Sequence, residues 1–201
     1  MNSLRRLDDR LLGDVNEFAR HTGWLHGAIF GYATYGLLLF AGLMLAALLI
    51  RRTGSDRGLA AAGWSALATL IAVGLNQPLV AAFDEPRPYT AHHDLLVLAS
   101  RSSDGSFPSD HAVMAGAAAA GLWLASRALG AIAAAAAVLM AFSRVYIAAH
   151  YPWDVVAGLA FGAFVALLGW FLLRRPLTAV TAWLRRQPGV RTAFGPVSTP
   201  A

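Results

Sequence analysis

Residues 142–175 are FSRVYIAAHYPWDVVAGLAFGAFVALLGWFLLRR. The stretch 155–173 has no charged side chain, and Arg174 and Arg175 follow it directly. About 20 apolar residues are enough for a helix to cross a bilayer, and paired arginines typically mark its cytoplasmic end. This segment therefore predicts a membrane helix, with a polar group of Ser, Arg, His and Asp gathered at its other end.

The composition of the whole chain agrees with a membrane protein. Of 201 residues, 57% are hydrophobic and 13% are charged, whereas soluble domains carry about 25% charged residues. Apolar segments are expected at about 27–50, 59–83, 110–125, 129–149 and 154–173. The third is marginal in length and begins with polar residues, so we expect its neighbours to shield it. The predicted fold class is all-α, a polytopic membrane helical bundle of about five transmembrane helices.

The two ends of the chain differ from this central part. In residues 1–26, apolar side chains recur every three or four positions with charged residues between them, at Leu4, Leu7, Leu11, Val15 and Phe18. This spacing predicts an amphipathic helix on a membrane surface. The expected organisation is an amphipathic helix over 1–26, a membrane-embedded domain over 27–175 and a cytoplasmic tail over 176–201.

The basic residues predict the orientation. All 16 are arginines, and nine fall on one side if five helices alternate: Arg51, Arg52, Arg57, Arg127, Arg174, Arg175, Arg185, Arg186 and Arg191. The positive-inside rule places that side in the cytoplasm. The loop 84–109 and the turn 150–153 then face outward from the plasma membrane. The arginines cluster beside apolar runs, so membrane lipid is the expected partner and nucleic acid is not. The side of the N-terminus and the oligomeric state stay open.

Residue types suited to phosphate binding and to catalysis lie together on the predicted outward side. Arg87 and Arg144 offer planar donors for phosphate oxygens, and Ser109 adds a hydroxyl where a helix N-terminus favours anions. His111 and His150 suit acid–base and nucleophilic roles. Asp154 follows His150 by four residues, a spacing at which its carboxylate accepts from one ring nitrogen and leaves the other free to attack.

These residues resemble the type-2 phosphatidic acid phosphatase superfamily, whose pattern is Lys-x6-Arg-Pro, Pro-Ser-x-His and Ser-Arg-x5-His-x3-Asp. The chain has Arg87-Pro88, Pro108-Ser109-Asp110-His111, and Ser143-Arg144 with His150 and Asp154. The resemblance implies a helical bundle that needs no metal or other cofactor. It implies His150 as the nucleophile that forms a phosphohistidine, Asp154 as its orienting carboxylate and His111 as the general acid. Arg87, Ser109 and Arg144 resemble the phosphate clamp.

One position departs from the pattern, because Val80 stands where the family lysine is expected. Asn76, Gln77, Arg101 and His92 are candidates to replace that lysine, and Asp110, Arg101 and Asn76 are possible additional substrate contacts. The stretches EPRPYTAH, SFPSDH and FSRVYIAAHYPWD resemble the bacitracin-resistance type of undecaprenyl-diphosphate phosphatase. This resemblance implies hydrolysis of undecaprenyl diphosphate to the monophosphate.

Alternative functions remain. A phosphatidate or phosphatidylglycerophosphate phosphatase requires the same site, and a lipid-phosphate transporter explains the arginines without the histidines. A vanadate-type peroxidase shares the anion site but not the membrane segments. In the loop, Asp84, Glu85 and Asp94 suit a solvated, gating or cation-contacting role, and His92-His93 are weaker candidates for a metal. The chain has no Cys, which excludes a disulfide framework and a thiolate nucleophile.

Overall fold

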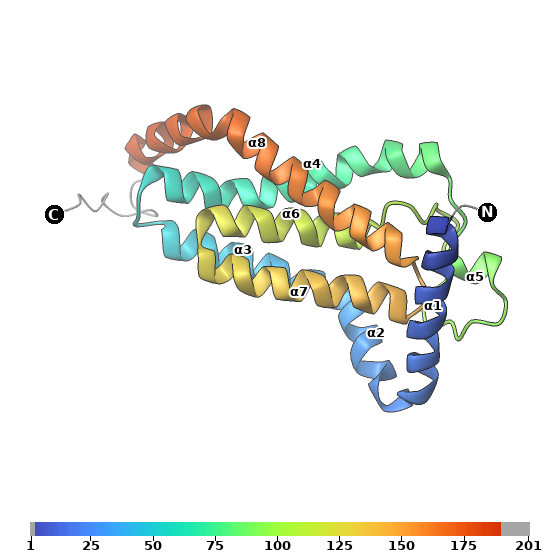
Figure 1. Ribbon diagram of the computed structural model, residues 1–201. Coiled ribbons are helices and arrows are strands. Elements are labelled where there is room, and N and C mark those ends of the chain that lie inside the picture. The colour runs from blue at the N-terminus through green and yellow to red at the C-terminus, as the bar shows by residue number, and fades with distance from the viewer. Residues whose placement is uncertain (1–2, 190–201) are drawn as a thin grey trace.

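The computed structural model describes residues 3–189, which form helices connected by loops and contain no strand. The long helices run along one bundle, and a short helix and an irregular loop lie at one end (Figure 1). The elements are α1 (Ser3–His21), the 3-10 turn η1 (Gly23–Leu25), α2 (His26–Tyr35), α3 (Leu37–Arg51), α4 (Asp56–Phe83), α5 (Pro88–Ala91), α6 (Asp110–Ala125), α7 (Arg127–Tyr146) and α8 (Pro152–Arg186). The all-α bundle predicted from the sequence is confirmed.

The predicted apolar segments are helical, although the first is divided between two helices, and most of these helices are suited to a bilayer. Among the described residues, three helical stretches are long and apolar enough to cross a membrane: Asp56–Ala91, Arg127–Tyr146 and Pro152–Arg186. A fourth span is possible if the bent pair Gly23–Tyr35 and Leu37–Arg51 is counted as one. These apolar helices support a membrane location.

Helix α6 is the exception and occupies the centre of the bundle. Its 16 residues extend only about 24 Å at 1.5 Å per residue, so its neighbours must shield it. It packs against α4, α7 and α8. A side chain at Gly116 or Gly162 would clash with the facing backbone, because a Cβ there would lie 2.3 Å from the Leu159 oxygen or 2.0 Å from the Val113 oxygen. Glycine thus allows α6 and α8 to approach closely.

Two predicted helix boundaries were wrong. The first apolar segment is broken between α2 and α3, with a 52° bend. The break lies at Gly36, where a Cβ would lie 2.5 Å from the Tyr32 oxygen and 2.8 Å from Met140 Cε. The last helix does not end at Leu173 but continues through Pro176 to Arg186. It persists because Leu177 packs on the core cluster of the bundle, and an internal proline is tolerated where neighbouring helices support the chain. The part of the predicted tail beyond residue 189 lies outside the described residues.

Helix α1 crosses the loop end of the bundle (Figure 1). Its buried side chains are Leu12, Asn16 and Ala19, while Leu4, Leu7, Leu11 and Phe18 of the predicted apolar stripe are exposed. The helix thus has one buried face and a separate, exposed apolar face. Asn16 fixes its position, since the side-chain amide donates to the Leu96 carbonyl at 2.8 Å and its oxygen accepts from the Leu96 N–H at 3.0 Å.

Candidate active site

Three helix ends and one loop meet at the end of the bundle that α1 covers. Ser109 is the N-cap of α6 and is followed by His111, Arg144 lies in the last turn of α7, and Asp154 lies in the first turn of α8. His150 lies in the turn between α7 and α8, and Arg87 is the N-cap of α5. The turn before His150 includes Ala148 in the left-handed region, with φ of 59°. The structure therefore brings together the six residues predicted to carry catalysis and phosphate binding.

The imidazole of His150 is held by its Nδ1 atom. This nitrogen lies 2.9 Å from the carbonyl oxygen of Ser106. A carbonyl only accepts hydrogen bonds, so Nδ1 carries the proton and Nε2 keeps its lone pair. Nε2 accepts a hydrogen bond from NH1 of the Arg87 guanidinium at 3.2 Å. This tautomer leaves Nε2 as the nitrogen that can attack an electrophile.

Ser106 is the functional candidate that sequence reasoning missed. Its hydroxyl is 2.5 Å from Asp154 Oδ2, to which it donates, and 3.4 Å from His150 Nδ1. Asp154 itself is 3.4 Å from Nδ1, further than the Ser106 carbonyl. The carboxylate also accepts from the N–H of Tyr151 at 2.9 Å. Asp154 and Ser106 therefore both help to hold the imidazole in its orientation. Ser106 is the first residue of the SFPSDH stretch quoted above. A sequence pattern does not show that its backbone carbonyl accepts a hydrogen bond from His150.

Arg87 is buried beside the imidazole and has several partners. Its Nε donates to the Asp104 carbonyl at 3.1 Å, its NH2 to Asp104 Oδ2 at 3.0 Å and its NH1 to the Ala149 carbonyl at 3.1 Å. The side chain is 9% exposed against 52% for Asp104. Asp104 therefore reaches Arg87 from the open side of the loop and holds its guanidinium next to His150.

The other two members of the predicted clamp retain free donors. The Oγ of Ser109 and the Nε of Arg144 are buried and have no hydrogen-bond partner among the described residues. Arg144 uses NH1 to donate to the Ala33 carbonyl at 3.3 Å. Buried donors without partners are uncommon because each costs about 1–3 kcal/mol. Two such donors beside His150 indicate a place for an oxygen-rich anion.

His111 completes the cluster from the first turn of α6. It lies close enough to Arg144, Arg87 and His150 to interact with them electrostatically. It is partly exposed, unlike the buried His150. The two imidazoles therefore have different surroundings, as a division between nucleophile and acid–base group requires.

Asn76 and Gln77 form contacts between helices. The amide of Asn76 donates to Asp110 Oδ1 at 2.8 Å and to the Pro108 carbonyl at 3.0 Å, and Gln77 donates to the same Asp110 oxygen at 3.0 Å. These bonds tie α4 to the first turn of α6, next to Ser109 and His111. Val80 packs against the loop, because its backbone oxygen and its side-chain Cγ1 would lie 3.1 Å and 3.2 Å from a Cβ at Gly105. The side chain at this position therefore supports the loop that carries Ser106.

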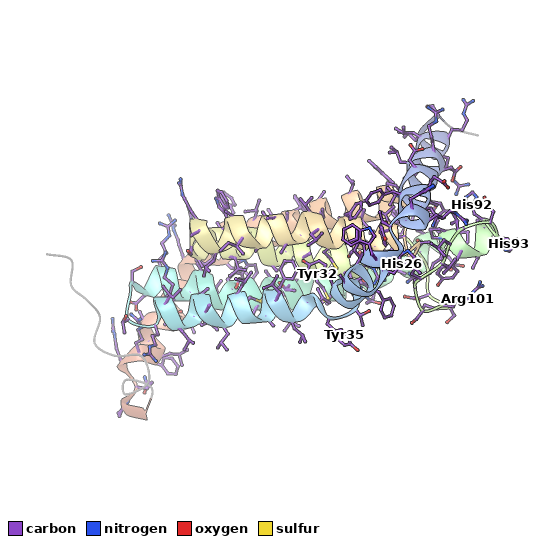
Figure 2. The ribbon with its side chains drawn as sticks, turned by 90° about the horizontal axis from the view of Figure 1, so that it is seen from below. His26, Tyr32, Tyr35, His92, His93 and Arg101 are labelled. Atoms are coloured by element: carbon purple, nitrogen blue, oxygen red, sulfur yellow. The ribbon has the colours of Figure 1, made fainter. Side chains whose placement is uncertain are left out.

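The remaining loop candidates lie outside the buried cluster. Figure 2 shows Arg101, His92 and His93 on the loop end of the molecule, and His26, Tyr32 and Tyr35 along α2. The guanidinium of Arg101 lies 5.5 Å from the centre of the Tyr89 ring, and His92 is paired with Asp9 at 3.3 Å. Among residues 3–189, no group of three His, Cys, Asp or Glu is arranged to hold a metal ion.

Burial, hydrogen bonds and neighbouring charges together shift the pKa values of ionisable groups at this end. Burial, and then the charges of Arg144 and Arg87, lower the pKa of His150 well below its ordinary value. His150 is therefore neutral at pH 7, as a nucleophile must be. Partial burial acts to raise the pKa of Asp104, but the Ser102 hydrogen bond and the charge of Arg87 outweigh it, so the pKa is lowered. Asp104 is therefore a carboxylate at neutral pH.

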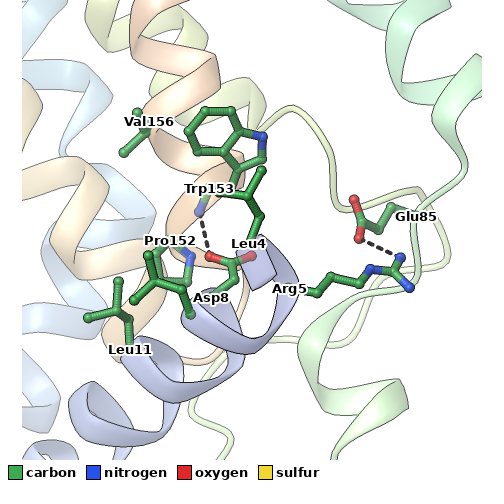
Figure 3. Close-up of a pocket in the computed structure, with 9 residues that line it drawn as sticks. Leu4, Arg5, Asp8, Leu11, Glu85, Pro152, Trp153 and Val156 are labelled. Atoms are coloured by element: carbon green, nitrogen blue, oxygen red, sulfur yellow. Dashed lines mark hydrogen bonds and ion pairs between the residues drawn. The ribbon is translucent and has the colours of Figure 1, made fainter. Parts of the chain in front are cut away.

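Helix α1 borders the cluster on the Asp154 side. A groove of about 410 Å³ lies between its first turns and the start of α8 (Figure 3). Asp8 accepts from the Trp153 N–H at 2.9 Å, and Arg5 is 3.2 Å from Glu85. Burial is the largest cause that raises the pKa of Asp8 to about 6. These contacts fix α1 to both α8 and the EPRP stretch.

The comparisons with known proteins agree with this geometry. The family model described as "PAP2 superfamily" matches residues 61–176. The chain is 28% identical to undecaprenyl-diphosphatase BcrC of Bacillus subtilis over 154 residues, which covers 77% of this chain and 78% of the relative. It is 44% identical over 63 residues to a lipid A 1-phosphatase of Rhizobium johnstonii, covering 31% and 26%. The crystal structure of Aquifex aeolicus LpxE superposes with a TM-score of 0.64 at 27% identity, covering 81% of this chain and 93% of that one. The match to more than half of the chain, on a bundle with the expected cluster of residues, shows that this protein belongs to the PAP2 superfamily.

Proposed function

We propose that this membrane protein is a phosphatase that hydrolyses undecaprenyl diphosphate to undecaprenyl phosphate and phosphate. The observation that carries the proposal is the state of His150, whose Nδ1 is engaged by Ser106 while Nε2 faces Arg87. Ser109 and Arg144 supply further donors beside it. The choice of substrate is supported by the similarity to BcrC over most of both chains.

In the first step, the Nε2 lone pair of His150 attacks the terminal phosphorus. A P–N bond forms, and the bond from that phosphorus to the bridging oxygen breaks. His111 donates its proton to the leaving oxygen, which belongs to the lipid monophosphate. Arg87, Arg144 and Ser109 donate to the phosphoryl oxygens, where negative charge is spread in the transition state.

In the second step, water attacks the phosphohistidine. His111, now neutral, takes a proton from the water, the P–N bond breaks, and phosphate leaves. Asp154 and Ser106 orient the imidazole and balance the positive charge that His150 carries as a phosphorylated ring. This scheme needs no metal from the protein. The active site is proposed to face the outer side of the plasma membrane, as the arginine distribution indicates.

The test uses purified protein in neutral detergent, with a chelator present. Undecaprenyl diphosphate, phosphatidate, phosphatidylglycerophosphate and lipid A are supplied separately, and phosphate release is measured. We expect the highest kcat/KM for undecaprenyl diphosphate and none of this activity in the His150→Ala variant. Faster phosphate release from one of the other lipids would reject undecaprenyl diphosphate as the preferred substrate. No phosphate release from any of the four lipids would reject the enzymatic function.

A further inference from the structure

The end of the bundle opposite the candidate site has a groove that catalysis does not use. It has a volume of about 530 Å³ and lies between the first turn of α4 and residues 174–182 of α8. Its lining consists of Arg57, Arg174, Arg175, Thr178, Ala179 and Ala182. Three arginines and no acidic residue therefore surround one concave surface.

These three guanidinium groups are available to a ligand. Among residues 3–189, none of them makes a hydrogen bond or ion pair, and Arg174 lies only over the Phe171 ring at 5.7 Å. The nearby carboxylate of Asp56 is already engaged by Arg185 at 3.0 Å. Arg185 is buried and also donates to the carbonyl oxygens of Gly54 and Arg52. The local acid is thus paired with a structural arginine, and none of the three groove arginines has an acidic partner.

The distribution of acidic residues adds to the positive electrostatic potential of the groove. Of the 11 acidic residues, only Asp56 lies near this groove. Four are in α1 and four lie between residues 84 and 104, while the last two begin α6 and α8. Those ten all lie at the candidate-site end. The groove therefore has a positive potential with no opposing surface charge, and it favours an anion.

The position of the groove indicates which anion it takes. From Pro152, the first residue of α8, to Arg174 the helix rises about 33 Å at 1.5 Å per residue. This length matches the roughly 30 Å hydrocarbon core of a bilayer. Arg174 and Arg175 therefore lie at the level of lipid head groups when the candidate site lies at the opposite surface. Ala179 and Ala182 leave room for a head group to approach the helix.

We propose that this groove is a binding site for the phosphate head group of an anionic phospholipid. Arginine guanidinium groups bind phosphate oxygens in a planar, bidentate geometry, and basic pockets between membrane helices are suited to such head groups. The ligand is a structural lipid of the opposite leaflet, distinct from the substrate. The site does not depend on the proposed function.

The experiment titrates purified protein in neutral detergent with phosphatidylglycerol or phosphatidylcholine and counts bound lipids by native mass spectrometry. We expect saturable binding of one phosphatidylglycerol, at least tenfold tighter than phosphatidylcholine. The double variant Arg57→Gln/Arg175→Gln is expected to weaken it about thirtyfold, from about 1 kcal/mol for each arginine near an anionic surface. The matched control Arg127→Gln/Arg186→Gln removes two exposed arginines of the same end outside the groove lining, and is expected to change binding less than threefold.

A second variant tests the shape of the groove with its charge unchanged. Ala179→Leu fills the groove and is expected to weaken phosphatidylglycerol binding at least fivefold. Equal losses in the two arginine pairs would show a general charge effect and overturn the site. Displacement of the lipid by inorganic phosphate at equal concentration would overturn its assignment to a lipid head group. Phosphatase activity in detergent is measured alongside and stays within twofold of the unmodified protein, so failure of this proposal is separate from failure of the proposed function.

Discussion

The arginine of the candidate site and the arginines of the groove at the other end of the bundle differ in burial and in pairing. At the candidate-site end, Arg87 is buried and is bound by Asp104, Ala149 and His150. At the other end, Arg57, Arg174 and Arg175 are exposed, with no hydrogen bond or ion pair among the described residues. A buried cation costs several kcal/mol unless it is paired, whereas an exposed cation at a membrane surface stays hydrated.

This difference in burial and pairing indicates where substitutions should have the largest effects on turnover. Side chains at the candidate-site end are connected through a buried hydrogen-bond network, so one change disturbs several neighbours. The exposed arginines at the opposite end share no hydrogen-bonding partner, so their substitutions should be nearly independent of one another. Substitutions in the buried network should therefore have large effects on turnover, and substitutions of the exposed groove arginines should have small ones.

The largest effect is expected for His150→Ala, which removes the proposed nucleophile. Turnover should fall by more than about 10⁴-fold, as when other catalytic nucleophiles are removed. Phosphate release in single-turnover experiments measures it, and circular dichroism confirms the helical fold. His93→Ala is the matched control, because it removes an exposed histidine of the same end. If His150→Ala kept more than a tenth of the activity, His150 would not be the nucleophile.

Ser106→Ala tests the buried network directly, because it keeps the backbone carbonyl and removes only the hydroxyl that joins Asp154 to the imidazole. The expected loss in kcat is about 10- to 100-fold, typical of partners that orient a reactive imidazole, with KM nearly unchanged. Ser103→Ala, in the exposed part of the same loop, should have no effect. An increase in KM alone would assign Ser106 to substrate binding and contradict the orienting role.

The pH dependence follows from the lowered pKa of His150. Because the folded protein holds this imidazole neutral, the acid limb of the kcat/KM profile should lie below about pH 6.5, the ordinary pKa of histidine. The same shift links to stability, since the unfolded chain binds a proton that the native state does not. This contribution to stability is present above pH 6.5 and is lost as the pH falls toward the folded pKa. An acid limb above pH 7 would contradict the assignment.

Asn76→Ala tests how strongly α4 holds α6. It removes the hydrogen bonds to the Pro108 carbonyl and to Asp110 Oδ1. Asp110 Oδ1 keeps the donor of Gln77, so the cost arises mainly at the buried Pro108, where removing the partner of a buried acceptor costs about 1–3 kcal/mol. Unfolding in detergent by a mild denaturant measures the change. Gln77→Ala removes the exposed neighbour and should cost less. Equal costs for the two variants would show that burial does not set the strength of this contact.

The smallest effect is expected for Arg5→Gln. The Arg5–Glu85 pair is 3.2 Å apart, with side chains 70% and 30% exposed, and such pairs contribute about 0.2–1 kcal/mol. Thermal unfolding should shift little, and raising the salt concentration should remove the difference. A loss of activity above tenfold would show instead that α1 is coupled to the site.

Much of this architecture could be predicted from the sequence because membrane helices follow hydropathy. The same principle failed at Gly36 and Pro176. At Gly36, where the helix is broken, a Cβ would meet the side chain of Met140 in another segment. The helix that continues past Pro176 depends on tertiary packing of Leu177. Both are long-range contacts that a local pattern does not contain.

The candidate site shows the same limit on a smaller scale. The spacing of His150 and Asp154 predicted an orienting carboxylate, and both residues do lie in one cluster. The nearer acceptor for Nδ1 is a main-chain carbonyl of Ser106, 44 residues away in the chain. Any residue type provides a carbonyl, so no side-chain pattern could have identified it. Asp104 was also missed, because a loop carboxylate is not distinctive until Arg87 is seen beside it.

The most direct test of the central claim is the position of the phosphate on the trapped intermediate. Radiolabelled undecaprenyl diphosphate is mixed with enzyme, the reaction is quenched with base within milliseconds, and the phosphorylated peptide is identified by mass spectrometry and ³¹P NMR. The tautomer fixed by Ser106 predicts phosphate on Nε2 of His150, labile to acid and stable to base. Phosphate on Nδ1, on another residue, or on no residue while turnover proceeds would contradict the account.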